Sequence, residues 1–350
     1  MAEAFTGFPG VRGHEHAQAR LSRAIARDQL HHGLIVMGPR GIGKAALALG
    51  LACALHCPVR PAVGCGRCTV CHRVLTGLHA GVERIVPEAE GGKIKVEVAR
   101  ELSHRLQHAP FEGQHHVVIF DPADALTEQA YNALLKSIEE PRPGVHFVMI
   151  TTHPDGLLPT ILSRCLPVRL GPLPLPLLTE VVQGVLAERQ RKAVAEGEEA
   201  PTPDPERLAL ALRLAQGSAG LALELAADPS LDDVLALVRS AMSAAHEGPA
   251  GIFSGDKGPL WSAWTQASGG AGPGRPARER AACGRALDLW LLHLREHLRG
   301  GQGLPGLPGA GAEVPALLHQ IDRLQALREG LERNPNVRLA LEQTLLELTA

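Results

Sequence analysis

One short motif constrains this chain of 350 residues more than any other feature. An apolar run, LIVMG at 34–38, leads into GPRGIGK at 38–44, and an Ala- and Leu-rich helical pattern follows directly. This is the G-x-x-x-x-G-K spacing, in the strand-to-helix context that the motif requires. Its glycines let backbone N–H groups approach phosphate oxygens, and its lysine reaches the terminal phosphates. Residues 38–44, called the phosphate loop below, therefore predict binding of ATP or ADP.

Two further apolar runs belong to the same predicted domain. They read VVIFD (117–121) and FVMITT (147–152), and their near-continuous apolar character is typical of parallel strands buried on both faces. An aspartate that ends such a strand opposite a phosphate loop helps to hold Mg²⁺, although alone it could equally be a helix cap. The threonine that ends the last run could contact a γ-phosphate. The predicted nucleotide-binding residues are Gly38, Gly41, Gly43, Lys44, Asp121 and Thr152.

Two parts that ATP hydrolysis needs are missing. A working loop carries Ser or Thr after its lysine, because that hydroxyl binds Mg²⁺, and here the residue is Ala45. Where ATPases with a D-E-x-D pattern carry the glutamate that polarises water, this chain has Pro122. Loss of a positioned general base typically costs about 10² to 10⁴ in rate. The sequence predicts an ATPase frame that binds nucleotide without hydrolysing it.

Four cysteines form a metal-binding pattern. Cys57 is followed by Cys65, Cys68 and Cys71, the last three at two-residue gaps. Four thiolates satisfy tetrahedral Zn²⁺ and leave no open position, so we expect a structural zinc ion. Cys53 competes with Cys57 as the first ligand, but it lies in an apolar helical segment where an inert buried thiol is favoured.

Charge and hydropathy limit the remaining classes. No apolar run reaches the roughly 18–20 residues that span a bilayer, and the first residues lack a signal-peptide pattern, so we expect a cytoplasmic protein. The 35 Lys and Arg against 37 Asp and Glu exclude a protein that coats DNA through bulk positive charge. Only 3% of residues are aromatic, which leaves no stacking platform for single-stranded nucleic acid.

Composition divides the chain into three predicted domains. Residues 1–170 alternate strands and helices, which indicates an α/β domain, whereas 171–230 and 231–350 show helical periodicity. The polar stretch 191–207 is predicted to be a loop. Arg164 lies too far from its own phosphate loop to serve it, so it is either a surface arginine or an arginine finger for a neighbour's site.

Several motifs together resemble one family, the delta-prime subunits of the bacterial DNA polymerase III clamp loader, which belong to the AAA+ group. The resemblance covers both ends of the chain and is weakest between about 185 and 330. It rests on GPRGIGK (38–44), the four cysteines, ADALTEQAYNALLKSIEEP (123–141), LLPTILSRC (157–165), GSAGLAL (217–223) and NPNVRLALEQTLLEL (334–348).

The resemblance implies a fold and a role. It implies an AAA+ α/β core with an inserted four-cysteine zinc module, a small helical lid at 171–230 and a C-terminal helical collar at 231–350 that closes a five-subunit ring. Arg164 would reach into the ATP site of an adjacent motor subunit. Gly220 stands where motor subunits carry a nucleotide-sensing arginine. The implied partners are the motor subunits (gamma/tau), the ring-opening delta subunit, the sliding clamp and primed DNA.

Other interpretations remain open at this point. The same motifs occur in the gamma/tau motor ATPase and in other AAA+ remodellers, and against these stand Ala45, Pro122 and Gly220 together. A zinc-dependent DNA-binding protein is disfavoured by the net charge of −2. We therefore expect a subunit of the polymerase assembly that has neither polymerase nor ATPase activity by itself.

Overall fold

The computed structural model describes residues 7–89, 92–108, 112–197, 202–270, 274–301, 303–309, 313–331 and 336–348. The chain divides into two compact units. One comprises Met1–Val185 and Gln216–Leu221, and the other comprises Leu186–Ala215 and Ala222–Ala350. The division into three domains stays a prediction. Among the described helices, none combines the length and apolarity needed to cross a membrane.

A five-stranded, entirely parallel sheet forms the centre of the first unit, in the order β2-β3-β4-β1-β5. The three predicted strands are confirmed as β1, β3 and β4, and every residue in them is buried. The sequence reading missed β2 and β5, because each has four residues and is partly exposed at a sheet edge. The bounds are Gly33–Met37 (β1), Val82–Ile85 (β2), His116–Phe120 (β3), Val145–Thr151 (β4) and Leu166–Arg169 (β5).

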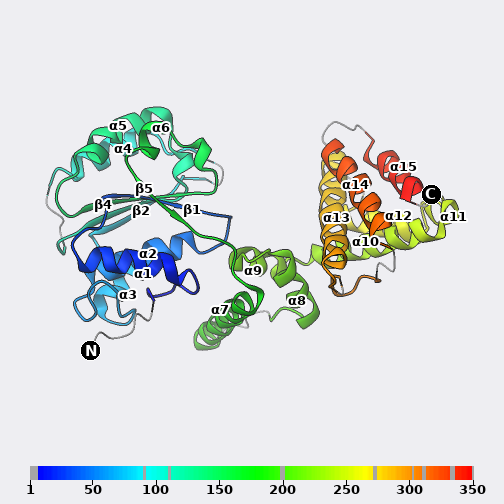
Figure 1. Ribbon diagram of the computed structural model, residues 1–350, viewed down its shortest axis with the longest axis horizontal. Coiled ribbons are helices and arrows are strands. Elements are labelled where there is room, and N and C mark those ends of the chain that lie inside the picture. Colours follow the sequence, from blue (N-terminus) through cyan, green and yellow to red (C-terminus); the bar gives the residue numbers. More distant parts are fainter. Residues whose placement is uncertain are drawn as a thin grey trace. The chain divides into compact units, whose positions relative to one another are not determined.

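Helices cover both faces of this sheet (Figure 1). On one face lie α1 (Glu15–Ala26), α2 (Lys44–His56) and α3 (Thr69–Leu75), and on the other lie α4 (Val96–Arg105), α5 (Glu128–Glu139) and α6 (Pro159–Leu162). A separate apolar core fills each side. The short 3₁₀ turns η1 (Ala123–Ala125) and η2 (Pro154–Gly156) follow β3 and β4. The parallel α/β class predicted from the sequence is thus confirmed.

The segment after β5 corrects one prediction. Helix α7 spans Leu175–Glu196, so residues 191–196 are helical and not part of a loop. Their composition, RKAVAE, is rich in good helix formers. Residues 198–201 of the predicted loop lie outside the described residues. Helix α8 (Pro205–Leu214) then begins where the Asp204 side chain accepts hydrogen bonds from the amides of Glu206 and Arg207, so residues 205–207 of the predicted loop are helical as well.

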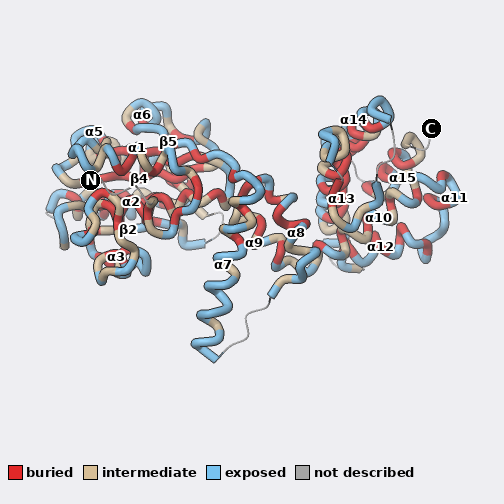
Figure 2. Tube along the Cα trace, turned by 60° about the horizontal axis from the view of Figure 1, so that its bottom comes forward, coloured by how far each residue is buried: buried red, intermediate tan, exposed pale blue. Residues whose placement is uncertain are grey.

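The second unit is helical throughout its described part. One continuous apolar core joins its helices and includes the buried side chains of Trp261, Trp264 and Trp290. Figure 2 marks such buried residues along the inner faces of these helices and along the strands of the first unit. The remaining helices are α9 (Ala219–Ala227), α10 (Ser230–Glu247), α11 (Pro249–Ile252), α12 (Pro259–Ala267), α13 (Arg275–Leu298), α14 (Val314–Gly330) and α15 (Val337–Leu348).

Candidate functional site

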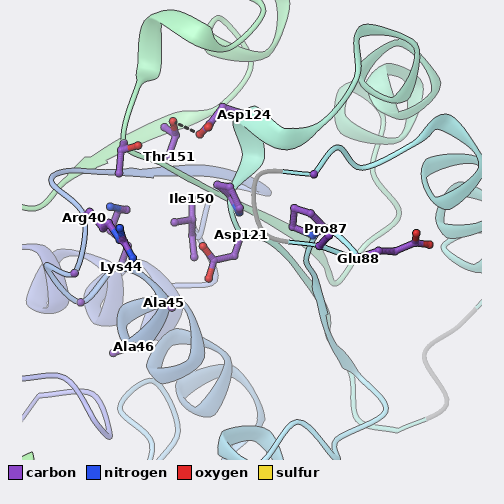
Figure 3. Close-up of a pocket in the computed structure, with 16 residues that line it drawn as sticks. Arg40, Lys44, Ala45, Ala46, Pro87, Glu88, Asp121, Asp124, Ile150 and Thr151 are labelled. Atoms are coloured by element: carbon purple, nitrogen blue, oxygen red, sulfur yellow. Dashed lines mark hydrogen bonds between the residues drawn. The ribbon is translucent and has the colours of Figure 1, made fainter. Parts of the chain in front are cut away.

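The phosphate loop joins β1 to α2 at the carboxyl edge of the sheet. Because all strands are parallel, the carboxyl ends of β3 and β4 meet at the same edge. A pocket of about 680 Å³ opens there, and Figure 3 shows the side chains around it. Five of the six predicted nucleotide-binding residues line it, and Gly38 begins the loop. The lining includes Gly41, Gly43, Lys44, Ala45, Asp121, Pro122, Asp124, Thr151, Thr152 and Pro87–Ala89.

Two glycines of the phosphate loop are required by close approaches. A Cβ at Gly38 would lie 2.4 Å from the carbonyl oxygen of Leu170. Gly41 has a φ of +72°, and a Cβ there would lie 2.6 Å from the Ser218 hydroxyl oxygen. A side chain at either position would therefore force the loop away from its neighbours.

Lys44 lies in the pocket, and its ammonium group contacts carbonyl oxygens of the phosphate loop itself. The side chain is buried, and Nζ donates hydrogen bonds to the carbonyl oxygens of Gly38 and Pro39, each at 2.7 Å. Burial lowers the pKa of Lys44, and the nearby carboxylates of Asp121 and Asp124 oppose that shift. The ammonium group is therefore held at the loop, where a phosphate group would compete with these carbonyls for it.

The two acidic residues beside the loop both have partners. The Arg84 guanidinium donates to Asp121 Oδ2 at 2.5 Å, and the Thr151 hydroxyl donates to Asp124 Oδ1 at 2.8 Å. Thr152, the predicted contact, instead has its hydroxyl 2.8 Å from a ring nitrogen of its neighbour His153. Sequence reasoning missed Arg84 because its strand, β2, was not recognised.

A backbone contact fixes the outer side of the phosphate loop. Gly220 donates its amide hydrogen to the Gly41 carbonyl oxygen at 2.9 Å, and the Ser218 hydroxyl donates to the Arg40 carbonyl oxygen at 2.7 Å. We call these two hydrogen bonds the clasp. A Cβ at Gly220 would lie 2.7 Å from Gly41 Cα, so the clasp leaves no room for a side chain there.

The four predicted metal ligands, called the cysteine cluster, converge. Their sulfur atoms all lie within 4.8 Å of one another, with 3.9 Å between Cys57 and Cys68 and 4.0 Å between Cys65 and Cys71. Tetrahedral Zn–S bonds of about 2.3 Å put sulfurs roughly 3.8 Å apart. Cys53 is fully buried outside this group, with its sulfur 3.8 Å from the Cys71 carbonyl oxygen. The donor set therefore fits a zinc ion without Cys53.

Backbone amides around the cysteine cluster stabilise thiolates. The amides of Arg60, Cys68 and Cys71 donate to the sulfurs of Cys57, Cys65 and Cys68, respectively. Backbone hydrogen bonds, foremost from Arg67, lower the pKa of Cys65 to about 6. Burial has the opposite effect on Cys53 and raises its pKa to about 11. Since metal ligation needs the thiolate, these amides favour a cation at Cys65, whereas burial raises the pKa of the Cys71 thiol.

Arg164 lies at the amino ends of the parallel strands, whereas the phosphate loop lies at their carboxyl ends. It precedes β5, and the parallel register of β1 and β5 places it beside Gly33, at the start of the strand that leads to the loop. Its Nε pairs with Glu139 Oε1 at 2.8 Å, and Nη1 donates to the Thr160 carbonyl oxygen at 3.0 Å. About 38% of the side chain stays exposed. Arg164 is thus partly exposed and does not line the pocket of its own chain.

Comparisons with known proteins concern mainly the first unit. Residues 13–174 match the family described as "DNA polymerase III, delta subunit". The chain is 35% identical over 182 residues to the DNA polymerase III subunit tau of Escherichia coli K12, covering 52% of this chain and 28% of that one. It is 39% identical over 149 residues to the delta' subunit of Pseudomonas aeruginosa, covering 42% and 45%, respectively. Over about its first half, the chain is therefore similar in sequence to subunits of DNA polymerase III.

The same comparisons leave the particular subunit open, since both tau and delta' are among the relatives. The chain spans less than half the length of these curated relatives. Among solved structures, a gamma subunit-related protein of DNA polymerase III from Thermotoga maritima aligns over 95% of this chain and 98% of that one, with 17% identity and a TM-score of 0.46.

Proposed function

We propose that this chain is the non-hydrolysing, delta-prime-type subunit of a clamp loader, in which it helps to place the sliding clamp on primed DNA. One observation carries the proposal: the pocket retains a phosphate loop with Lys44, yet Ala45 and Pro122 line it where hydrolysis needs a hydroxyl and a glutamate. The phosphate loop that would bind a triphosphate is present, but the hydroxyl and the glutamate that hydrolysis of the triphosphate needs are absent.

The clasp supports the same proposal. In motor subunits of the family that the sequence resembles, an arginine that senses nucleotide stands at the position of Gly220. Here the Gly220 amide donates to the phosphate loop, and a Cβ would meet Gly41 Cα at 2.7 Å. An arginine is therefore excluded by the packing itself, and the exclusion agrees with Ala45 and Pro122.

Arg164 is the proposed contribution of this chain to catalysis. Its side chain is half-exposed and held by Glu139 at the edge away from its own pocket. In the ring we expect it to enter the ATP site of the adjacent motor subunit, gamma or tau, and to stabilise the charge that develops on the transferred phosphate. The delta subunit and the clamp are the further proposed partners, and the cysteine cluster is proposed to hold a structural zinc ion.

A second candidate is the gamma/tau motor ATPase or another AAA+ remodeller. The relatives named tau and the intact glycines and Lys44 favour it. ATP turnover by the purified chain separates the two. We expect turnover no greater than that of a Lys44→Ala control, and strong turnover only after the motor subunits are added. Turnover by the chain alone at the rate of a motor subunit would identify it as the second candidate.

A further inference from the structure

We propose that the phosphate loop binds its nucleotide without Mg²⁺, because Arg84 neutralises the carboxylate that a metal ion would otherwise neutralise. The inference rests on the proposed function, since a site that does not hydrolyse ATP does not need the metal for catalysis. The expected ligand is a free nucleoside di- or triphosphate.

The residues present do not fit the Mg²⁺ ion that such loops ordinarily use. Mg²⁺ demands near-octahedral oxygen ligands. The methyl group of Ala45 supplies none, and Thr151 holds Asp124 Oδ1 at 2.8 Å. Figure 3 shows the Asp124 carboxylate turned toward Thr151 and away from Lys44. Among the described acidic residues that line the pocket, only Asp121 turns its carboxylate toward Lys44 in Figure 3, and Arg84 donates to its Oδ2 at 2.5 Å.

Arg84 also removes the repulsion that a cation-free site would suffer. In a metal-containing site the ion lies between the strand-end aspartate and the phosphates. Without the ion, the Asp121 carboxylate would face the phosphate oxygens directly, with like charge. The side chain of Asp121 is only 18% exposed, so water screens this repulsion poorly. The guanidinium offsets that charge from the neighbouring strand β2 and leaves Lys44 and the loop amides to bind the phosphates.

Isothermal titration calorimetry of the full chain with ATP and with ADP tests the proposal. Metal is removed from the buffer with a chelating resin and not with a dissolved chelator, which would extract metal from the cysteine cluster. We expect the wild-type Kd to change by less than about threefold when excess MgCl₂ is added. Greater tightening by Mg²⁺, or no binding in either buffer, overturns the proposal.

Three variants isolate the role of Arg84. Arg84→Ala should weaken metal-free binding about tenfold, because Asp121 then faces the phosphates unpaired. The double variant Arg84→Ala/Ala45→Thr should become Mg²⁺-dependent. Arg105→Ala is the matched control. Arg105 pairs with Glu83, the neighbour of Arg84 on β2, and neither residue of this pair lines the pocket, so the substitution should leave the Kd unchanged. Unchanged metal-free binding by Arg84→Ala would contradict the role of Arg84.

The outcome is distinguishable from failure of the proposed function. If the wild type requires Mg²⁺ for binding but does not turn ATP over, this inference fails and the non-hydrolysing role stands. If the chain hydrolyses ATP by itself, the proposed function fails whatever the Mg²⁺ dependence of binding.

Discussion

At the scale of single residues, missing side chains shape this site as much as the side chains that are present. Ala45 provides no hydroxyl for Mg²⁺, and Pro122 provides no carboxylate to polarise water. Both absences can be identified from the sequence motifs alone. Gly220 could be flagged from the sequence as a missing arginine. Its contact with Gly41 could not be predicted, because that contact joins residues 179 positions apart in the chain and depends on backbone packing.

The clasp makes Gly220 sensitive to one added carbon. We expect Gly220→Ala to lower the free energy of unfolding by about 1–3 kcal/mol, because its Cβ would overlap Gly41 Cα. Gly184→Ala on α7 is the matched control. A Cβ there meets nothing within 4 Å, so this helix substitution should stabilise by roughly 0.5–1 kcal/mol. Urea unfolding followed by circular dichroism measures both, and equal effects would refute the packing argument.

A buried histidine predicts a pH dependence of stability. His146 on β4 has its Nδ1 buried without a hydrogen-bond partner among the described residues, and His115 Nδ1 lies 3.2 Å from its Nε2. Burial, and next the charge of His115, lowers the pKa of His146 to about 4. Between the unfolded pKa of roughly 6.5 and this value, only the unfolded chain takes up the proton, so stability is lost as the pH falls.

The size of this effect is measurable by substitution. Between pH 7 and 5 the wild type should lose about 1–2 kcal/mol through His146, which His146→Phe should not lose. Urea unfolding of both proteins at the two pH values gives the difference. His246→Phe, an exposed histidine near the end of α10, is a control that should keep the wild-type pH dependence. Identical slopes for wild type and His146→Phe would contradict the assignment.

At the scale of elements, the sequence predicts best where burial is uniform. The strands β1, β3 and β4 are continuous apolar runs in which every residue is buried. The four-residue strands β2 and β5 carry no comparable signal. Because β2 was not recognised, Arg84 was not placed beside the site. The ion pair between Arg84 and Asp121 could therefore not be predicted. The cysteine cluster was found because two-residue spacing is a local property that needs no tertiary information.

The stability of the segment between α2 and β2, which contains the cysteine cluster, should depend on a bound metal ion. We expect one zinc ion per chain, lost in Cys65→Ser/Cys68→Ser together with several kcal/mol of stability, since structural zinc contributes folding free energy. Elemental analysis and thermal unfolding measure the two effects. Cys53→Ala is the control that should retain the ion. A wild-type protein purified without zinc would remove the metal assignment.

At the scale of the whole molecule, the first unit places the two proposed functional sites at opposite ends of its strands. The carboxyl edge of the sheet holds the phosphate loop, and the amino edge carries Arg164 with its partner Glu139. The parallel register of β1 and β5 enforces this separation. In the proposed role, this unit would bind nucleotide at its own phosphate loop and present Arg164 to the ATP site of a neighbouring subunit.

Substitution of Arg164 tests this role in the assembled complex. Arg164→Ala should cost at most about 1 kcal/mol of stability, because a partly exposed ion pair contributes little. It should slow ATP hydrolysis at the adjacent motor site by at least about tenfold. Arg142→Ala, which removes an exposed arginine just after α5, should leave the rate unchanged. Equal rates for Arg164→Ala and wild type in the reconstituted complex would exclude the contribution in trans.

The clasp also has a mechanical consequence. Residues 216–221 belong to the first unit, while the chain on both sides of them belongs to the second. This short stretch is therefore a tether, anchored to the phosphate loop by Gly41 and Arg40. A ligand that displaces the phosphate loop therefore acts on residues 216–221 through these two hydrogen bonds.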